Sequence, residues 1–235
     1  MKKKFNLTIL AEIAIFAALG FALDALQGGY SRGLFPSGGS IGIAMLPILV
    51  ISYRRGLIPG LLCGLLLSIV QMLSSLYVIN ATSYENGFLR VMGPFIQIML
   101  DYVLSYTLVG CAGVFAKKYK KADTFGQKVL LIVLGCILGG MLKYLVQTIS
   151  GGVFWVDPST SFMGIEGGSW LFSFIYNGAY NIPNIILCII VMLILLKFYP
   201  QFIDINKKEE LNNEINDENN LDNKEIEEGD NNNEE

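Results

Sequence analysis

Histidine is absent from all 235 residues of the chain, and so is the phosphate-binding motif G-x-x-x-x-G-K-[ST]. Without histidine, a Ser-His-Asp triad, an H-E-x-x-H zinc site and a histidine proton relay are excluded. Without the phosphate loop, the usual route of nucleotide hydrolysis is excluded. The apolar segments also offer no nucleophile paired with a base and no clustered carboxylates. We therefore expect no enzymatic activity, no metal site and no cofactor.

Cysteine is scarce and follows no pattern. The four copies, Cys63, Cys111, Cys136 and Cys188, lie inside apolar segments at unrelated spacings. Disulfide frameworks and zinc sites are recognised by characteristic cysteine spacings. We expect these thiols to be small buried hydrophobes that stay reduced.

Long apolar runs dominate what is present. Apolar residues make up 53% of the chain, and the mean hydropathy is +0.51. A helix needs about 20 mainly apolar residues to cross a bilayer, so the sequence predicts an all-α integral membrane protein with six transmembrane helices. The expected spans are 7–26, 41–53, 57–77, 94–116, 129–149 and 170–198. The second is short, and Pro47 is expected to interrupt it, so we expect a kinked helix or one assisted by its neighbours. Pro94 is expected in the first turn of the fourth.

Charge is distributed unevenly along the chain. Residues 1–200 contain 14 Lys/Arg and 7 Asp/Glu, whereas residues 201–235 contain 3 and 13. Basic residues gather at alternate loops, and cytoplasmic loops carry an excess of Lys and Arg. We therefore expect both termini in the cytoplasm and the loops 27–40, 78–93 and 151–168 outside. A six-helix transmembrane domain at 1–200 is expected to precede a disordered acidic cytoplasmic tail at 201–235.

Small residues recur along the first span at three- and four-residue spacing. They are Ala11, Ala14, Ala18 and Ala22. Such a series lets another helix approach closely. From the pattern alone, packing within the chain is favoured over a docking surface for another protein.

Polar side chains gather on the last two spans, where they are costly unless they face a protein interior or a water-filled cavity. The fifth span carries Lys143, Gln147 and Gly151 at four-residue spacing, with Trp155 one step further. The sixth span carries a helical stripe formed by Asn177, Tyr180, Asn181 and Asn184. Because the two spans are joined on the outside, the stripes predict a ligand pocket that opens to the exterior.

Asp101 is the only acid clearly inside a predicted span, apart from Asp24 near an outer end. We expect it at the depth of Lys143, in the outer half of the membrane. A carboxylate beside Trp and Tyr suits a cationic aromatic ligand through charge pairing, cation–π contact and stacking. The alternative, a structural ion pair between Asp101 and Lys143, stays open because intramembrane ionisable residues also tend to pair.

Five segments follow one another along the chain: EIAIFAALGFALD, GGSIGIAMLPILVISYRRG, LDYVLSYTLVG, KYLVQTISGGVFW and SFIYNGAYNIP. In this order they resemble the thiamine-specific S-components of energy-coupling factor (ECF) vitamin transporters. The resemblance covers roughly residues 8–198. It implies a six-helix subunit of the cell membrane that captures thiamine from outside with high affinity. The implied partners are a transmembrane coupling subunit and two ATPase subunits that use the ATP; no nucleic acid is expected.

The resemblance also implies roles for individual residues. The A-x-x-x-A motif that docks on the coupling subunit falls on Ala14 and Ala18, which reverses the preference for internal packing. The implied substrate-binding positions are Asp101, Tyr102, Gly151, Trp155 and Asn177. The polar stripes add Lys143 and Tyr180 to this expected set.

Three positions depart from the pattern of the family. Its acid is commonly Glu where this chain has Asp101, a common histidine is replaced by Gln147, and an expected Tyr is replaced by Phe172. Each replacement keeps size or polarity, so we expect the pocket to survive. The choice among thiamine, its phosphates and its pyrimidine precursor stays open.

Two other functions stay open at this point. An S-component for another vitamin, with a neutral or anionic ligand, would not need Asp101. A stand-alone secondary transporter would take up its substrate without ATPase partners, driven by an ion gradient. An intramembrane enzyme ranks last.

Overall fold

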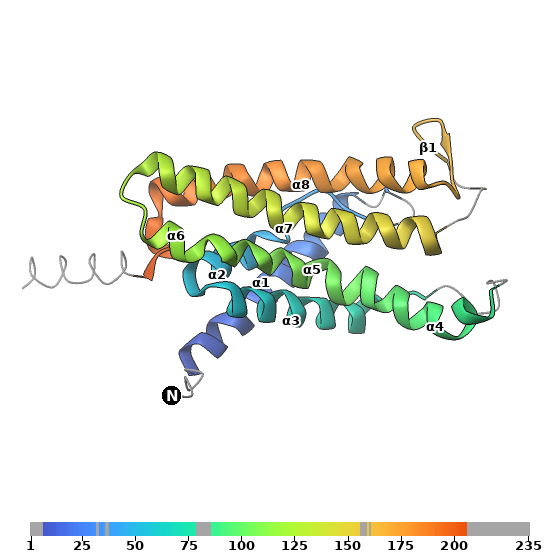
Figure 1. Cartoon of the computed structure of the whole chain (residues 1–235), viewed down its shortest axis with the longest axis horizontal. Helices are drawn as coiled ribbons and strands as arrows, with labels where there is room; N and C mark the ends of the chain where they lie inside the picture. Colours follow the sequence, from blue (N-terminus) through green and yellow to red (C-terminus); the bar gives the residue numbers. More distant parts are fainter. Residues whose placement is uncertain are drawn as a thin grey trace, which may run out of the picture.

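The computed structural model describes residues 7–31, 33–35, 38–78, 86–155, 159 and 161–205. The elements in chain order are α1 (Leu7–Ser31), α2 (Leu46–Arg55), α3 (Leu57–Ser75), α4 (Gly87–Ile98), η2 (Met99–Leu104), α5 (Ser105–Thr107), η3 (Leu108–Phe115), α6 (Ala116–Lys120), α7 (Phe125–Phe154), β1 (Ser161–Phe162), β2 (Ile165–Glu166), α8 (Trp170–Phe198) and η4 (Pro200–Phe202). The two strands form a small antiparallel hairpin before α8 (Figure 1). Residues 206–235 of the expected acidic tail lie outside the described residues.

Helices of membrane-spanning length confirm an all-α membrane protein. Within the described residues, five stretches are long and apolar enough to cross a bilayer: Leu7–Ser31, Leu57–Ser74, Gly87–Lys120, Phe125–Phe154 and Trp170–Phe198. The expected second span instead contains α2, which has only ten residues. At about 1.5 Å per residue, such a helix covers half of the hydrocarbon thickness.

The prediction that Pro47 interrupts a helix was wrong. Pro47 lies in the first turn of α2, where its missing N–H needs no partner. The residues before it are irregular, and side chains from other helices satisfy their backbone. Asn184 accepts a hydrogen bond from the Gly42 N–H at 2.6 Å, and Gln27 accepts one from the Ala44 N–H at 3.1 Å.

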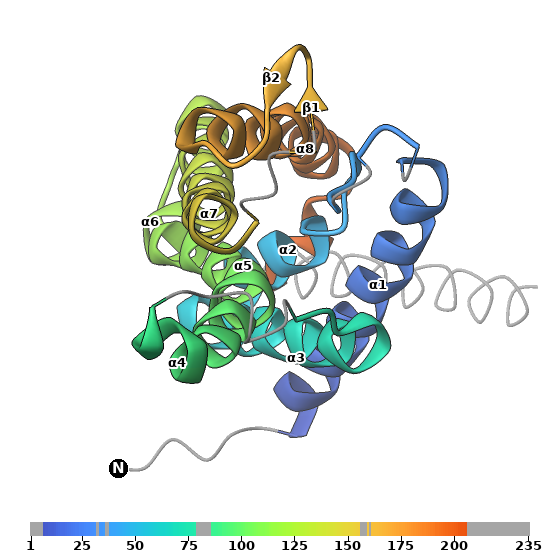
Figure 2. The same ribbon diagram turned by 90° about the vertical axis from the view of Figure 1, so that its right-hand side faces the viewer.

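Burial explains why so short a helix is stable. In the view along the bundle, α2 lies in the middle with longer helices around it (Figure 2). Ile48, Leu49, Ile51 and Tyr53 are completely buried, and the Tyr53 hydroxyl donates to the Leu131 carbonyl on α7. Packing on all sides therefore replaces the length that a lipid-facing helix needs.

Two other boundaries correct the sequence expectations. The predicted loop 27–40 begins five residues too early, because α1 continues to Ser31. The Ser31 hydroxyl accepts a hydrogen bond from the Ile41 N–H at 3.2 Å, which fixes this extra turn. The fourth span begins at Gly87, so Pro94 lies inside α4 and not in its first turn. After α4, residues Met99–Leu104 form a π-helical segment that contains Asp101.

Glycines allow the backbones of α3 and the fourth span to touch. A Cβ atom on Gly64 would lie 2.3 Å from the Tyr106 carbonyl oxygen. A Cβ atom on Gly110 would lie 2.4 Å from the Gly60 carbonyl carbon. No side chain fits at either contact, so this helix pair depends on glycine.

One end of the bundle carries a network of charged groups. The Glu12 carboxylate forms ion pairs with Arg54 at 3.2 Å and Arg55 at 2.5 Å. Lys120 donates to the Arg54 carbonyl, and Arg54 donates to the Gln201 carbonyl, both at 2.9 Å. The network therefore joins α1, α2, α6 and η4 at the end opposite the hairpin (Figure 1).

Candidate ligand-binding site

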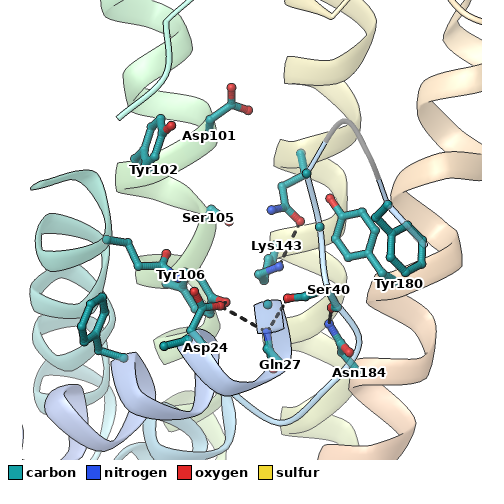
Figure 3. Close-up of a pocket in the computed structure, with 18 of the residues that line it drawn as sticks. Asp24, Gln27, Ser40, Asp101, Tyr102, Ser105, Tyr106, Lys143, Tyr180 and Asn184 are labelled. Carbon is teal, nitrogen blue, oxygen red and sulfur yellow. Dashed lines mark hydrogen bonds between the residues drawn. The ribbon is translucent and has the colours of Figure 1, made fainter. Parts of the chain in front are cut away.

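A cavity of about 660 Å³ lies among α1, α3, the η2–α5 segment, α7 and α8 (Figure 3). Its volume falls within the range of about 300–1,000 Å³ that is usual for small-molecule sites. The predicted binding residues that line it are Asp101, Tyr102, Lys143, Gln147 and Tyr180. All lie in the half of their helix far from the Glu12–Arg54 network, so the cavity belongs to the hairpin end.

Asp101 lies at the upper end of the cavity as drawn in Figure 3. The Trp155 Nε1 donates to Asp101 Oδ2 at 3.1 Å. The Trp155 ring stacks on Tyr77 with 5.4 Å between centroids and 27° between planes. Trp155 itself is not among the lining residues, and its link to the cavity is the hydrogen bond to Asp101. Residues 54 positions apart thus form one acidic, aromatic corner.

Tyr102 follows Asp101 in the π-helical segment and faces the end of α3. Its hydroxyl accepts a hydrogen bond from the Tyr77 N–H at 2.8 Å. Tyr77 therefore contacts both Trp155 and Tyr102, and it joins α3 to the acidic corner. π-Helical segments are frequent at functional sites because they present side chains that a regular helix would place elsewhere.

Lys143 is buried on the opposite wall of the cavity, with 4% of its surface exposed. Its Nζ donates to Gln147 Oε1 and to Asn181 Oδ1, each at 3.0 Å. The same nitrogen lies 5.1 Å from the Tyr106 ring centroid and 5.6 Å from that of Tyr180. These are distances at which an ammonium group is attracted by a ring face.

The alternative of an Asp101–Lys143 ion pair is contradicted. Both residues belong to the described part of the chain, and the ion pairs found there join Glu12 to Arg54 and Arg55. Asp101 contacts an indole N–H, whereas Lys143 contacts two amide oxygens and two aromatic rings. Both charged groups therefore remain available to a ligand.

The polar stripe on α8 is buried throughout its length. Tyr180 and Asn184 line the cavity, whereas Asn177 and Asn181 lie behind it. The Tyr180 hydroxyl donates to Asn177 Oδ1, and the Asn181 Nδ2 donates to Gln147 Oε1 at 2.8 Å. The stripe therefore supplies both lining residues and the groups that orient them.

Gly151 and Phe172 occupy supporting positions outside the cavity lining. A Cβ atom on Gly151 would lie 2.3 Å from Ser173 Oγ and 3.0 Å from Asn177 Nδ2, so the glycine lets α7 approach α8. Phe172 stacks on Tyr176 with ring centroids 5.4 Å apart. Tyr176 contacts Phe35 and Tyr180 edge-on, and both of these residues line the cavity.

Several lining residues were not predicted as binding positions: Asp24, Gln27, Gln71, Ser74, Ser105 and Tyr106. Gln27 Nε2 donates to Ser40 Oγ at 2.8 Å and to Asp24 Oδ1 at 3.2 Å. The signal that could have found this group is the spacing of Asp24, Gln27 and Ser31, which is that of one helix face. This helix face was missed because a loop was expected to begin at residue 27.

Ala14 and Ala18 lie on the exposed side of α1, together with Ala11 and Ala22. The opposite side of the helix, with Ile13 and Ala17, packs into the bundle. Packing of the alanine series within this chain, which the pattern alone favoured, therefore does not occur.

Comparisons with known proteins agree on one family. Residues 10–204 match the family model described as thiamine transporter protein. Thiamine transporter ThiT of Bacillus subtilis is 33% identical over 210 residues, which cover 88% of this chain and all of the relative. ThiT of Lacticaseibacillus paracasei is 29% identical over 204 residues, 86% of this chain and 92% of the relative.

A solved structure supports the fold. ThiT from Listeria monocytogenes superposes with a TM-score of 0.63 at 26% identity, over 84% of this chain and 98% of the other. These relatives are transporters and not enzymes, as the sequence predicts. With its apolar helices and a family match over most of its length, this chain belongs to the thiamine transporter family and is a multi-pass membrane protein.

Proposed function

We propose that this chain captures thiamine on the outer side of the cell membrane with high affinity, as the substrate-binding subunit of an ATP-driven ECF transporter. One observation supports thiamine as the ligand: Asp101 lines the cavity and accepts a hydrogen bond from the Trp155 indole N–H. A carboxylate, an indole and nearby tyrosines attract a positively charged aromatic ring by charge, stacking and cation–π contact. Thiamine has such a ring.

Each predicted residue receives a role in this proposal. Asp101 supplies the negative charge, and Trp155 and Tyr102 supply the aromatic border. Gln147 and Tyr180 offer hydrogen bonds from the wall of the cavity. The supporting positions are Asn177, which orients Tyr180; Gly151, which brings α7 and α8 together; and Phe172, which backs the aromatic wall. Lys143 fixes Gln147 through the bond at 3.0 Å.

In the membrane, we propose six helices with both termini in the cytoplasm and the hairpin outside. Residues 1–200 form the substrate-binding domain, with α2 as an internal helix that does not span alone, and residues 201–235 form an acidic cytoplasmic tail. The Glu12–Arg54 network gathers Arg54, Arg55 and Lys120 at one end, as expected for the cytoplasmic side.

Energy would come from partner chains. We propose that the exposed alanines of α1, at Ala14 and Ala18, dock on a transmembrane coupling subunit that carries two ATPases. Small residues at this spacing permit the close helix approach that such docking needs in lipid, where no hydrophobic force drives association.

Uptake by reconstituted liposomes tests this proposal. Liposomes that contain this chain alone should accumulate no thiamine under an imposed proton or sodium gradient. Liposomes that also contain the coupling subunit and the two ATPases should accumulate it when ATP is enclosed. Accumulation by the chain alone would identify a secondary transporter. Accumulation of a different vitamin in place of thiamine would overturn the assignment of thiamine as the ligand.

A further inference from the structure

Three charged side chains line the cavity among the described residues, and their formal charges do not cancel: Asp24, Asp101 and Lys143. If Asp101 were the only acid, Lys143 would cancel it and the cavity would be neutral. Charge would then give no preference for a cation. The second carboxylate therefore decides the net charge that a ligand meets.

Tyr106 connects Asp24 to Lys143. The Tyr106 hydroxyl donates to Asp24 Oδ1 at 2.9 Å, while the face of the same ring lies 5.1 Å from Lys143 Nζ. Tyr106 is buried, with 8% of its surface exposed. A phenol that donates to a carboxylate becomes richer in electrons, which strengthens its attraction for a cation over its face.

Asp24 is held in place by a second contact. Gln27 Nε2 donates to the same Oδ1 at 3.2 Å, and Gln27 is fixed in turn by Ser40 and by the Ala44 N–H. Across the buried Tyr106 ring, the opposite charges of Asp24 and Lys143 attract each other. Asp101 lies in another part of the cavity, where it is bonded to Trp155.

We propose that Asp24 is the counter-charge of Lys143, and that it makes the cavity selective for cations by leaving the charge of Asp101 uncancelled. Asp24 is thus a positioning residue that acts through Lys143 and Tyr106. In a poorly hydrated cavity, an uncompensated ammonium group repels a positive ring over several ångströms. The proposal rests on the proposed function, because it specifies how the same site selects its ligand.

The test measures two affinities for each variant by isothermal titration calorimetry on the purified full chain. One ligand is thiamine, and the other is a thiamine analogue in which a neutral ring replaces the thiazolium. The variants are Asp24→Asn, Asp24→Glu, Lys143→Gln and the double variant Asp24→Asn/Lys143→Gln. The exposed loop acid Asp123 provides the matched control, Asp123→Asn.

Asp24→Asn should weaken thiamine binding about tenfold or more while changing the affinity for the neutral analogue little. The double variant should restore the ratio of the two affinities, because both members of the charge pair are gone. Asp24→Glu and Asp123→Asn should keep the wild-type ratio. A purely structural role of Asp24 would weaken both ligands equally and would not be rescued by Lys143→Gln.

Equal losses for both ligands, an unchanged ratio in Asp24→Asn, or no rescue in the double variant would each overturn the inference. If Asp24→Asn does not purify as a folded protein, Lys143→Gln alone decides. The Lys143→Gln variant should raise the ratio of the affinity for thiamine to the affinity for the neutral analogue. A lower ratio than in the wild type overturns the inference. Failure of the wild-type chain to bind thiamine would instead overturn the proposed function.

Discussion

At the scale of single residues, the acidic corner is built from neighbours that constrain one carboxylate oxygen. The Trp155 indole N–H donates a hydrogen bond to Asp101 Oδ2, and the stacked Tyr77 ring keeps the indole in place. Asp101 and Tyr102 line the cavity, so a carboxylate and an aromatic ring face the space for a ligand. This arrangement combines a carboxylate with flat aromatic surfaces.

Asp101→Asn removes the charge and keeps the size and an acceptor oxygen. We expect thiamine to bind about tenfold to a hundredfold more weakly, because a hydrogen bond or contact to a charged group contributes about 1.5–3 kcal/mol. Calorimetric titration of the purified variant checks this. The control is Asp123→Asn, on the exposed loop before α7. Equal affinity of Asp101→Asn and the control would remove Asp101 from the site.

The sequence predicted part of the cavity at this scale. The stripes on the last two spans identified Lys143, Gln147 and Tyr180 because a helix places residues three and four apart on one face. The contacts between distant segments were not predictable. Nothing in the pattern pairs Asp101 with Trp155 in place of Lys143, or Tyr106 with Asp24, because these choices depend on how the helices pack.

At the scale of elements, the helices differ in how closely they pack and in which faces they leave exposed. α3 touches the fourth span through glycine, α2 is enclosed by its neighbours, and α1 turns its alanine series outward. The apolar runs predicted five of the helices well. They overestimated the second, because an enclosed ten-residue helix and an irregular apolar segment before it look like one interrupted span.

Gly64→Val should destabilise the protein by about 1–3 kcal/mol, because its side chain would overlap the Tyr106 carbonyl oxygen and force α3 away. Thermal unfolding in detergent, followed by circular dichroism, measures the change. Gly126→Val is the control, since a Cβ atom there meets nothing within 4 Å. Similar melting temperatures for both variants would contradict the close backbone contact.

Ala14→Trp and Ala18→Trp should abolish ATP-driven uptake in liposomes that contain the partner subunits, because a bulky side chain prevents close approach to α1. Thiamine binding to the purified variants should stay at the wild-type level, since the cavity lies elsewhere. The matched control, Ile190→Trp, changes an exposed position on α8. Normal uptake by both alanine variants would exclude this face as the docking surface.

At the scale of the whole molecule, the proposed orientation in the membrane rests on the distribution of charge between the two ends of the bundle. The Glu12–Arg54 network and the lysines of α6 mark one end, and the cavity and the hairpin mark the other. If the charged end lies in the cytoplasm, as proposed, the cavity opens to the outside.

Cysteine labelling checks this orientation. In intact cells, a membrane-impermeant maleimide should label Ser161→Cys on the exposed hairpin above the wild-type background, and it should label Asp123→Cys only after the membrane is permeabilised. The opposite labelling pattern would reverse the topology and place the cavity on the cytoplasmic side.

The most direct test of the central claim is a titration of thiamine against the intrinsic fluorescence of the purified chain, which contains two tryptophans. We predict saturable quenching below micromolar thiamine in the wild type and in Trp170→Phe, and loss of most of the signal in Trp155→Phe. A flat titration of the wild type at micromolar thiamine, confirmed by calorimetry, would contradict a thiamine site bordered by Trp155.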